Sequence, residues 1–205
     1  MFVLTVDQID SREAEDDDVA PILADRADWQ ARGALLGPDR TAGDEFQLVF
    51  ADAAAALDAA LRLRRDGRWT VGIGVGGIRT PLPATTGAAR GEAFLTARTA
   101  VDTAKRTPHH LAVVAPDGAA SVGVTALVGL LLEVRARRSP EGWEVADLLA
   151  AGLSQSAVAE RLGVSPQAIS LRARTAAVRL EREATPALVA ALADLDGPRP
   201  LASAE

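Results

Sequence analysis

The chain has 205 residues, of which 48% are hydrophobic, and a formal net charge of −6 at pH 7. This length and apolar content suffice for one sizeable folded domain or two small ones. The absence of cysteine excludes disulfides and thiolate zinc sites, and the only two histidines, His109 and His110, are too few for a His-rich metal site.

Neither the N-terminus nor the longest apolar stretch has a pattern typical of membrane targeting or membrane spanning. The N-terminus has no basic residue before its short apolar run, unlike a secretory signal. The longest apolar stretch, residues 122–134, is shorter than the roughly 20 residues that span a bilayer. We therefore expect a soluble, cytoplasmic protein with no membrane partner.

The first 115 residues alternate between strand-like and helix-like patterns. Strands are predicted at 2–6, 46–50, 69–78 and 111–115, with a short strand at 34–36 in the irregular stretch 33–42. Helices are predicted at 19–32, 53–65 and 89–106. This order favours an α+β, ferredoxin-like sandwich with antiparallel strands.

Glycines alternate with apolar residues in the predicted strand at 69–78. Gly72, Gly74 and Gly76 fall on one face of that strand. Glycine weakens a strand, so three on one face indicate that another backbone or a ligand approaches closely.

From Pro116 onward only helical patterns follow. A helix is predicted at 122–138, apolar first and basic at its end, followed by a break at Ser139-Pro140. Three further helical segments are predicted at 143–151, 154–162 and 165–183. We expect a sensor domain at 1–116, a connecting and dimerisation helix at 117–138, an all-α DNA-binding domain at 139–185, and a terminal helix with a frayed tail at 186–205.

The stretch GLSQSAVAERLGVSPQAISLRARTA is the most specific in the chain. Two helices that cross at a tight turn need a small residue at the crossing, here Ala159, and a glycine able to take positive φ, here Gly163. Ser165 is placed to cap the following helix, with Pro166 at its first position. Apolar residues suited to seal the pair are Val158, Leu162, Val164 and Ile169.

This stretch resembles the helix-turn-helix of bacterial transcriptional regulators. The resemblance implies a double-stranded DNA partner and a DNA-facing set of Ser165, Gln167, Ser170, Leu171 and Arg174. Gln167 suits an adenine edge, and Arg172 and Arg174 suit guanine or phosphates. Leu171 stands where a polar residue is more usual, which leaves a register shifted by one residue as an alternative.

Charge is distributed unevenly along the chain. Residues 135–182 contain eight arginines and five acids, a net charge of +3, which leaves −9 for the remainder. Such asymmetry favours a polyanionic partner for the C-terminal part. The alternative for this part is an ordinary αα-hairpin or a dimerisation module with a solvated basic face.

Two carboxylates are predicted at the ends of strands in the N-terminal part. Asp7 ends the first strand, and Asp44 immediately precedes the strand at 46–50. If these strands are neighbours, the two side chains can share a hard divalent cation such as Mg²⁺ or Mn²⁺, completed by carbonyl and phosphate oxygens. The alternative is a surface turn with two adjacent acids, Asp44 and Glu45.

The same residues carry a family resemblance. The motif GDEF resembles the namesake motif of GGDEF diguanylate cyclases and the corresponding positions of class III nucleotidyl cyclases, and ARTAVDTAKR resembles the GGDEF-domain helix that ends in Ala-Lys-Arg. The opening DxxDSR, GDEFQ and the terminal helix-turn-helix together resemble the SatD-like family of small bacterial proteins.

The resemblance implies roles for individual residues. Asp7 and Asp44 would bind the metal ion, with the Gln8 carbonyl as a further ligand. Lys105 would contact the phosphates of a purine nucleotide, and Glu45 would act beside the metal ligands. Ser11 and Arg12, in the loop after the first strand, would cradle phosphate.

The chain departs from the cyclases at several positions. Ala42 replaces the first glycine of GGDEF, and the Arg-x-x-Asp inhibition motif and the transition-state Arg and Asn pair are missing. We therefore expect a homodimeric transcriptional regulator whose degenerate cyclase-like domain binds nucleotide and metal without catalysis. The alternatives are an active nucleotidyl cyclase or related phosphoryl-transfer enzyme, and a DNA-binding protein with an inert dimerisation scaffold.

Overall fold

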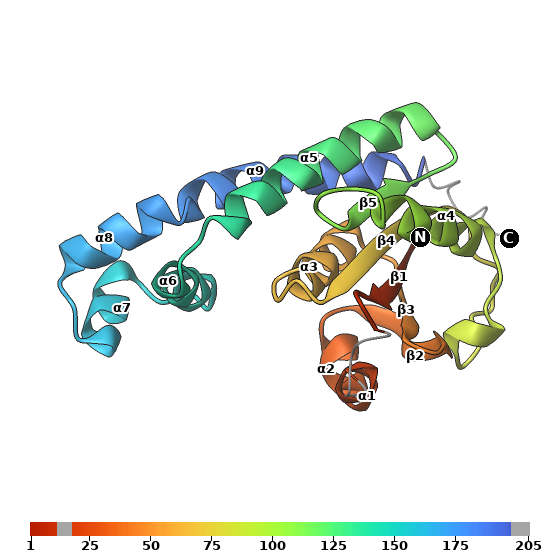
Figure 1. Cartoon of the computed structure of the whole chain (residues 1–205), viewed down its shortest axis with the longest axis horizontal. Coiled ribbons are helices and arrows are strands. Elements are labelled where there is room, and N and C mark those ends of the chain that lie inside the picture. Colours follow the sequence, from red (N-terminus) through yellow and green to blue (C-terminus); the bar gives the residue numbers. More distant parts are fainter. Residues whose placement is uncertain (12–17, 198–205) are drawn as a thin grey trace, which may run out of the picture. The chain divides into compact units, whose positions relative to one another are not determined.

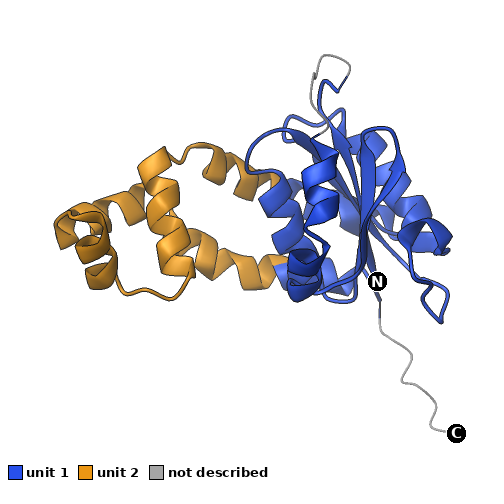
Figure 2. Cartoon of the chain, turned by 90° about the horizontal axis from the view of Figure 1, so that it is seen from below, with its two compact units in different colours: residues 1–127, 189–205 blue, residues 128–188 orange. Residues whose placement is uncertain are grey.

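A computed structural model describes residues 1–11 and 18–197. The chain divides into two compact units, coloured blue and orange in Figure 2. Unit 1 contains Met1–Leu127 and the chain from Val189 onward, and unit 2 contains Val128–Leu188. The expected connecting segment, 117–138, contributes to both units. The secondary structure is mixed α and β, in agreement with the α+β class predicted from the sequence.

Unit 1 is built on a five-stranded sheet with the order β2-β3-β1-β4-β5 (Figure 1). Neighbouring strands are antiparallel, except that β4 and β5 are parallel. The strands are β1 (Phe2–Gln8), β2 (Ala34–Ala42), β3 (Glu45–Phe50), β4 (Trp69–Val75) and β5 (Leu111–Val114). The central strand β1 is covered on both faces, since Val3, Leu4 and Val6 have no exposed surface.

Helix α4 (Glu92–Ala104) packs on one face of the sheet at backbone distance. A Cβ built on Gly72 would lie 2.2 Å from the Val101 nitrogen, and one on Gly74 would lie 2.1 Å from the Ala97 nitrogen. The helix residues buried here are mostly alanines: Ala93, Ala97, Ala100 and Ala104. The close approach that the strand glycines indicated is therefore to a helix backbone.

Three helices cover the opposite face of the sheet, namely α1 (Val19–Ala24), α2 (Arg26–Ala31) and α3 (Ala53–Leu63). Side chains alternate along a strand, so Trp69 points away from α4. Its ring meets Phe46 edge-on at 5.3 Å, and it lines a small cavity with Trp29 of α2 and Leu63 of α3. Helix α3 begins where the Asp52 side chain accepts a hydrogen bond from the Ala55 nitrogen at 2.9 Å.

Two expectations for residues 19–42 were wrong. The helix predicted at 19–32 is two short helices separated at Asp25. The stretch expected to be irregular, with a short strand at 34–36, is the nine-residue strand β2. The pairing of β2 with β3 shifts register three times, which removes the alternation of apolar and polar residues that identifies a strand in sequence.

The remaining elements of unit 1 lie near the predicted positions. The strand predicted at 69–78 ends at Val75, and the helix predicted at 89–106 spans Glu92–Ala104. Between them lies the short 3₁₀ helix η1 (Thr86–Ala88). The chain after Val189 belongs to unit 1, where Leu192 is fully buried and the Asp196 carboxylate pairs with the N-terminal ammonium of Met1.

Helix α5 (Gly118–Ala136) is longer than the apolar stretch within it. Among residues 1–11 and 18–197 it is the one helix long and apolar enough to cross a membrane, with 19 residues and a mean hydropathy of 1.6. Of its most apolar window, 28% is buried, and a single helix of this kind is weak evidence for a membrane span, so a soluble protein is compatible with the structure. A cytoplasmic location remains a prediction.

Unit 2 contains a cluster of three short helices, α6 (Pro140–Ala150), α7 (Gln155–Leu162) and α8 (Pro166–Thr175). Their shared core consists of Val145, Val158, Ala159, Ile169 and Ala173. All five residues predicted to seal or cross the pair belong to this core or pack against it: Val158, Ala159, Leu162, Val164 and Ile169.

The helix predicted at 165–183 is wrong, because α8 ends at Thr175 and α9 (Val178–Asp194) begins after a break. Ala177 has a φ of +52°. The buried Arg138 guanidinium donates to the Ala176 carbonyl at 2.7 Å and pairs with Glu181. Arg138 comes from a segment 38 residues earlier, so this contact at the break has no local sequence signal.

Candidate functional site

The end of β1 lies beside the Gly-Asp-Glu-Phe corner, which is the condition on which a shared metal site at Asp7 and Asp44 depended. Asp7 is the register partner of Glu45 in the antiparallel pair of β1 and β3. Directly opposed residues in such a pair project to the same face of the sheet, here the face that α4 covers. Asp44 lies in the turn just before β3 and is half-buried.

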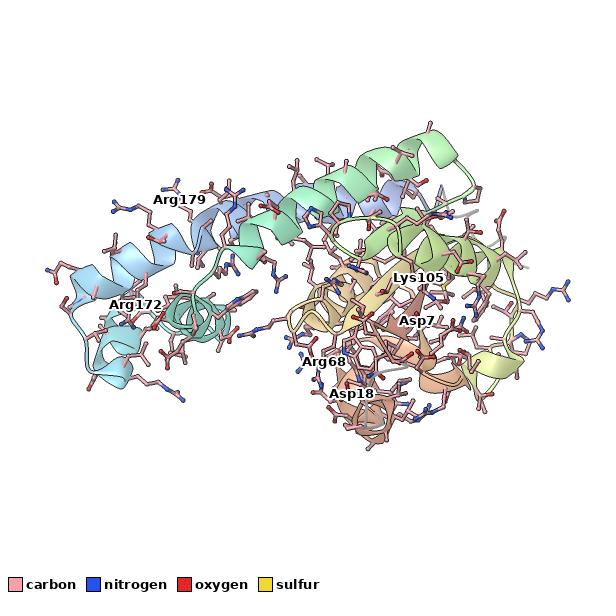
Figure 3. All side chains as sticks on the ribbon, in the orientation of Figure 1. Asp7, Asp18, Arg68, Lys105, Arg172 and Arg179 are labelled. Atoms are coloured by element: carbon pink, nitrogen blue, oxygen red, sulfur yellow. The ribbon has the colours of Figure 1, made fainter. Side chains whose placement is uncertain are left out.

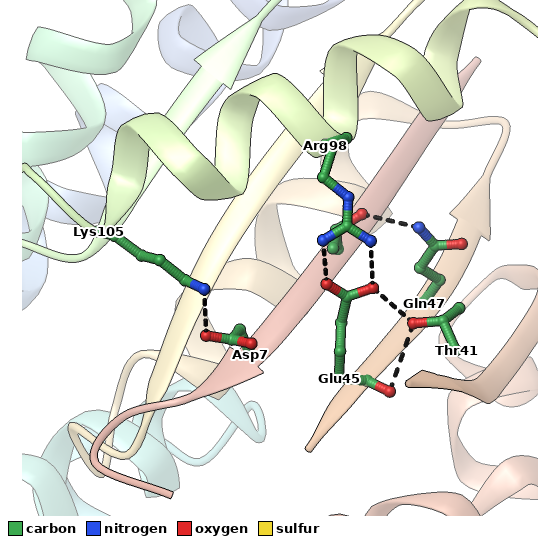
Figure 4. Close-up of polar contacts among 7 residues, drawn as sticks. Asp7, Thr41, Glu45, Gln47, Arg98 and Lys105 are labelled. Carbon is green, nitrogen blue, oxygen red and sulfur yellow. Dashed lines mark hydrogen bonds and ion pairs between the residues drawn. The ribbon is translucent and has the colours of Figure 1, made fainter. Parts of the chain in front are cut away.

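Glu45 is buried, with 4% of its surface exposed, and its charge is compensated by α4. Both terminal nitrogens of Arg98 donate to its two carboxylate oxygens, the Nη2 to Oε1 distance being 2.7 Å (Figure 4). The Thr41 hydroxyl donates to Oε1 at 2.5 Å. Hydrogen bonding to Glu45 outweighs partial burial and raises the pKa of Arg98.

Asp7 is paired with a second cation, Lys105, which is the C-cap residue of α4. The Lys105 Nζ lies 2.7 Å from Asp7 Oδ2 (Figure 4). Arg98 and Lys105 are seven residues apart, or two helical turns, and therefore share a helix face. The sequence pointed to Lys105 but not to Arg98, although this spacing was a signal that could have found it.

A polar pair also lies inside this face, one step along the strands from Asp7 and Glu45. The Gln47 amide donates to the Thr5 hydroxyl at 3.0 Å, and both residues are buried. Neither was predicted as a site residue. The row Thr5–Gln47 followed by the row Asp7–Glu45 makes the sheet face polar toward the Gly-Asp-Glu-Phe corner.

The side chains of the other residues expected to bind nucleotide do not surround Asp7. Gln8 points to the opposite face, and its amide donates to Asp18 at 3.0 Å. Asp18 also accepts from Arg68 at 2.9 Å (Figure 3). Ser11 is half-buried beyond the end of β1, and Arg12 lies outside the described residues. For Gln8, only the main-chain carbonyl can belong to a site at Asp7.

Metal binding at this corner would depend on few protein ligands. Within the described parts of the chain, no three Asp, Glu, His or Cys side chains are grouped closely enough to hold a metal ion. Mg²⁺ is commonly held by one or two carboxylates together with phosphate oxygens and water. The assignment of Asp7 and Asp44 as the ligands of such a complex stays a prediction.

The turn between α7 and α8 has the geometry expected from the sequence. Gly163 adopts the left-handed conformation with φ of +65° and ends α7. The Ser165 side chain accepts a hydrogen bond from the Ala168 nitrogen at 3.2 Å, and Pro166 opens α8. These local features fix where α8 starts. Packing of Ile169 and Ala173 into the core of unit 2 decides which of its faces is buried.

The residues predicted to face DNA lie mostly on the exposed side of α8. Ile169 and Ala173 point into the core of unit 2. Arg172, labelled in Figure 3, is half-buried, and 53% of Leu171 is exposed. The residues of the predicted set that are exposed are Ser165, Gln167, Ser170, Leu171 and Arg174.

Asp39 ties β2 to η1 on the α4 side of the sheet. Its Oδ2 accepts from the Thr86 nitrogen at 2.8 Å and from the Thr86 hydroxyl at 3.2 Å, and its Oδ1 pairs with Arg26. Desolvation acts to raise the pKa of Asp39, but the hydrogen bonds from Thr86 and the charge of Arg26 outweigh it and lower that pKa. Asp39 was not predicted as a site residue.

We expect Asp39→Asn to lower the free energy of unfolding at pH 7 by about 1–2 kcal/mol, because a charge-assisted set of hydrogen bonds becomes neutral. The pKa of Asp39 in the folded state lies below its value in the unfolded chain, which is about 3.8. The charged carboxylate therefore stabilises the fold at pH values above about 3.8, and this contribution is lost as the pH falls through the pKa of the folded state. The difference between wild type and variant should therefore shrink on acidification.

Urea denaturation of both proteins at several pH values between about 3 and 7 measures this difference. Asp58→Asn is the matched control, since Asp58 is an exposed partner of Arg62 on α3. A difference between wild type and Asp39→Asn that stays constant down to pH 3 would contradict the assigned role of Asp39.

Comparisons of the chain with protein-family models, with curated proteins and with solved structures found no match.

Proposed function

We propose that the protein is a DNA-binding transcriptional regulator in which α7 and α8 form a helix-turn-helix. The observation that carries this proposal is the exposed polar face of α8, set by the left-handed turn at Gly163 and the Ser165 cap. In such a motif the start of the second helix enters the major groove. Gln167, Ser170 and Arg174 are then placed to contact base edges and phosphates.

Further arginines support phosphate contacts by unit 2. A groove of about 640 Å³ beside α8 is lined by Gln155, Ser170 and Arg174, together with Arg179 and Arg182 at the start of α9. Arg179 is exposed and pairs with Glu183 at 2.7 Å. Positive side chains around an exposed helix raise affinity for DNA by releasing counterions from its phosphates.

Selection of duplexes from a random pool by the purified full chain, followed by fluorescence anisotropy, tests this proposal. We expect enrichment of a defined sequence whose affinity falls linearly with salt on a log–log plot, measured between about 50 and 200 mM. A pool that shows neither enrichment nor salt-dependent binding would overturn the proposed function.

For unit 1 we propose a ferredoxin-like, nucleotidyl cyclase-like sensor domain. The support is topological, since the antiparallel order β2-β3-β1-β4, with α1–α3 in the connections, matches the order of a ferredoxin-like sheet. The resemblance of the Gly-Asp-Glu-Phe corner to GGDEF and SatD-like proteins adds to it. Asp7 and Asp44 would hold Mg²⁺ or Mn²⁺ with a purine nucleotide, and the metal would neutralise phosphate charge there.

We expect a purine nucleoside triphosphate with Mg²⁺ to raise the melting temperature of the chain. At about 100 times the dissociation constant, ligand binding stabilises by about 2.7 kcal/mol, which for a chain of this size is a shift of roughly 5–10 °C. The metal-dependent part of this shift in melting temperature is the part that EDTA abolishes. The substitution Asp44→Ala should abolish the same part. Differential scanning fluorimetry with Asp58→Ala as control measures this, and an unaltered EDTA-sensitive shift in Asp44→Ala would place the metal elsewhere.

The two alternative functions give different results in the same samples. A nucleotidyl cyclase or related phosphoryl-transfer enzyme would convert nucleoside triphosphates with Mg²⁺ or Mn²⁺ to a cyclic or dinucleotide product. An inert scaffold would show no thermal shift with nucleotide and metal while DNA binding stays intact. The departures from the cyclase motifs favour sensing over catalysis.

A homodimer is part of the proposal. Three large apolar side chains of α5 are exposed, Val122, Leu127 and Leu130, at 71%, 49% and 66%. Burying such side chains against a second copy is favourable by roughly 25 cal/mol per Å². A twofold dimer would present two α8 helices to half-sites about one DNA turn apart.

A further inference from the structure

An open groove of about 1290 Å³ lies on the α4 face of the sheet, beside the corner described above. Its walls come from β2 and β3, the segment after β4, the η1 segment and the first half of α4. Thr41, Gln47 and Arg98 of the close-up in Figure 4 line it. All of these residues belong to unit 1.

The groove is strongly basic. Four arginines from separate segments line it, namely Arg40, Arg79, Arg90 and Arg98, against one lining carboxylate, Glu92. Guanidinium groups match phosphate oxygens in geometry and hold them by two parallel hydrogen bonds. Because both terminal nitrogens of Arg98 are already held by Glu45, the charges offered to an anionic ligand must come from the other arginines.

The positive charges of two of these arginines, Arg79 and Arg90, are available to a ligand. Arg90 Nη1 donates to the main-chain carbonyls of Gly87 and Ala89, each at 2.7 Å, which orients the guanidinium without neutralising it. Arg79 is exposed. Among the described residues no carboxylate forms an ion pair with either arginine.

The groove also has an apolar part. Ile78 and Phe94 are partly buried in its wall, and 73% of Leu95 is exposed. An exposed leucine beside an aromatic ring and several guanidinium groups favours a ligand whose charges are attached to a flat or apolar body. Inorganic anions alone would leave this part of the groove unused.

We propose that this groove binds a small organic polyanion, a nucleotide-like molecule with two or more phosphates on a planar ring. Arg79 and Arg90 hold phosphate, and Phe94 and Leu95 contact the ring. Neither Asp7 nor Asp44 lines the groove, and the proposed binding needs no metal ion. The inference does not depend on the proposed DNA-binding function or on the metal–nucleotide site.

Calorimetric titration of the full chain at low salt with EDTA tests the proposal, using ATP, pyrophosphate and adenosine as probes. We expect ATP to bind, pyrophosphate to bind more weakly and adenosine not to bind. The double variant Arg79→Ala/Arg90→Ala should lose at least about tenfold in ATP affinity. Arg79→Glu, which changes one exposed side chain and leaves the Arg90 hydrogen bonds intact, should lose more than Arg79→Ala.

The control variant Arg62→Ala/Arg65→Ala removes the same charge from α3 and its end, outside the groove. An equal loss in this control would mean non-specific attraction and would overturn the proposal, as would a wild type that binds no phosphate compound. The variant Asp44→Ala should still bind ATP in the absence of metal. Loss of this binding in the variant would place the ligand at the Gly-Asp-Glu-Phe corner and not in the groove. Competition by a short DNA duplex as strong as by ATP would assign the groove to nucleic acid and also overturn the proposal.

Discussion

The double substitution Gln167→Ala/Arg174→Ala is expected to lower the affinity of the chain for its selected DNA site about 100-fold. Both side chains are exposed on α8, on the side opposite the buried Ile169 and Ala173. Each good contact to a base edge contributes about 1–3 kcal/mol of discrimination against the wrong base. A lost phosphate contact also reduces the slope of log affinity against log salt concentration by about one. Anisotropy titrations with the selected site and a scrambled duplex measure both effects.

The matched control is Gln30→Ala/Arg62→Ala, which makes the same changes at exposed positions of α2 and α3 in unit 1. Its affinity should stay within about twofold of the wild type, since its side chains lie outside the proposed DNA-binding helix. Melting curves establish that both variants are folded. An affinity of the α8 variant equal to that of the control would disprove the assignment of these two residues.

Gly74→Ala is expected to destabilise unit 1 by about 3 kcal/mol. The new Cβ would lie 2.1 Å from the Ala97 nitrogen and 2.4 Å from the Ala93 oxygen, atoms of the α4 backbone that cannot turn aside as a flexible side chain does. Relief requires α4 to move away from β4, which opens the alanine packing between them. The expected fall in melting temperature is roughly 6–12 °C.

Gly77→Ala provides the control for this substitution. Gly77 follows β4 by two residues, and a Cβ built there meets no atom within 4 Å. Its effect on stability should stay within about 0.5 kcal/mol, as for an ordinary surface substitution. Equal melting temperatures of Gly74→Ala and Gly77→Ala would contradict backbone contact between β4 and α4.

Features that depend on neighbouring residues were predicted well from the sequence. The Gly163 turn and the Ser165 cap need only a few consecutive residues, and both were found as expected. The alternation of Phe46, Leu48 and Phe50 likewise located β3. The strand glycines indicated close packing but could not distinguish a helix from a ligand.

Features that depend on distant residues were missed. The partner of Glu45, Arg98, lies 53 residues away, and Arg138 meets the Ala176 carbonyl from 38 residues earlier. The shifts of register in β2 are a response to its pairing with β3. No local pattern links Glu45 to Arg98 or Arg138 to Ala176; for Arg98 the only local signal was its spacing of two helical turns from Lys105.

The sequence by itself determined the types and approximate positions of most elements, because periodicity, caps and turns are local properties of the chain. The position of Asp7 beside the Gly-Asp-Glu-Phe corner depends on the pairing of β1 with β3, which the sequence left as a condition. The tertiary structure alone decided that Lys105 and Arg98 compensate Asp7 and Glu45, and that four arginines line one groove. Those side chains come from separate segments, and only the packing of α4 against the sheet brings them together.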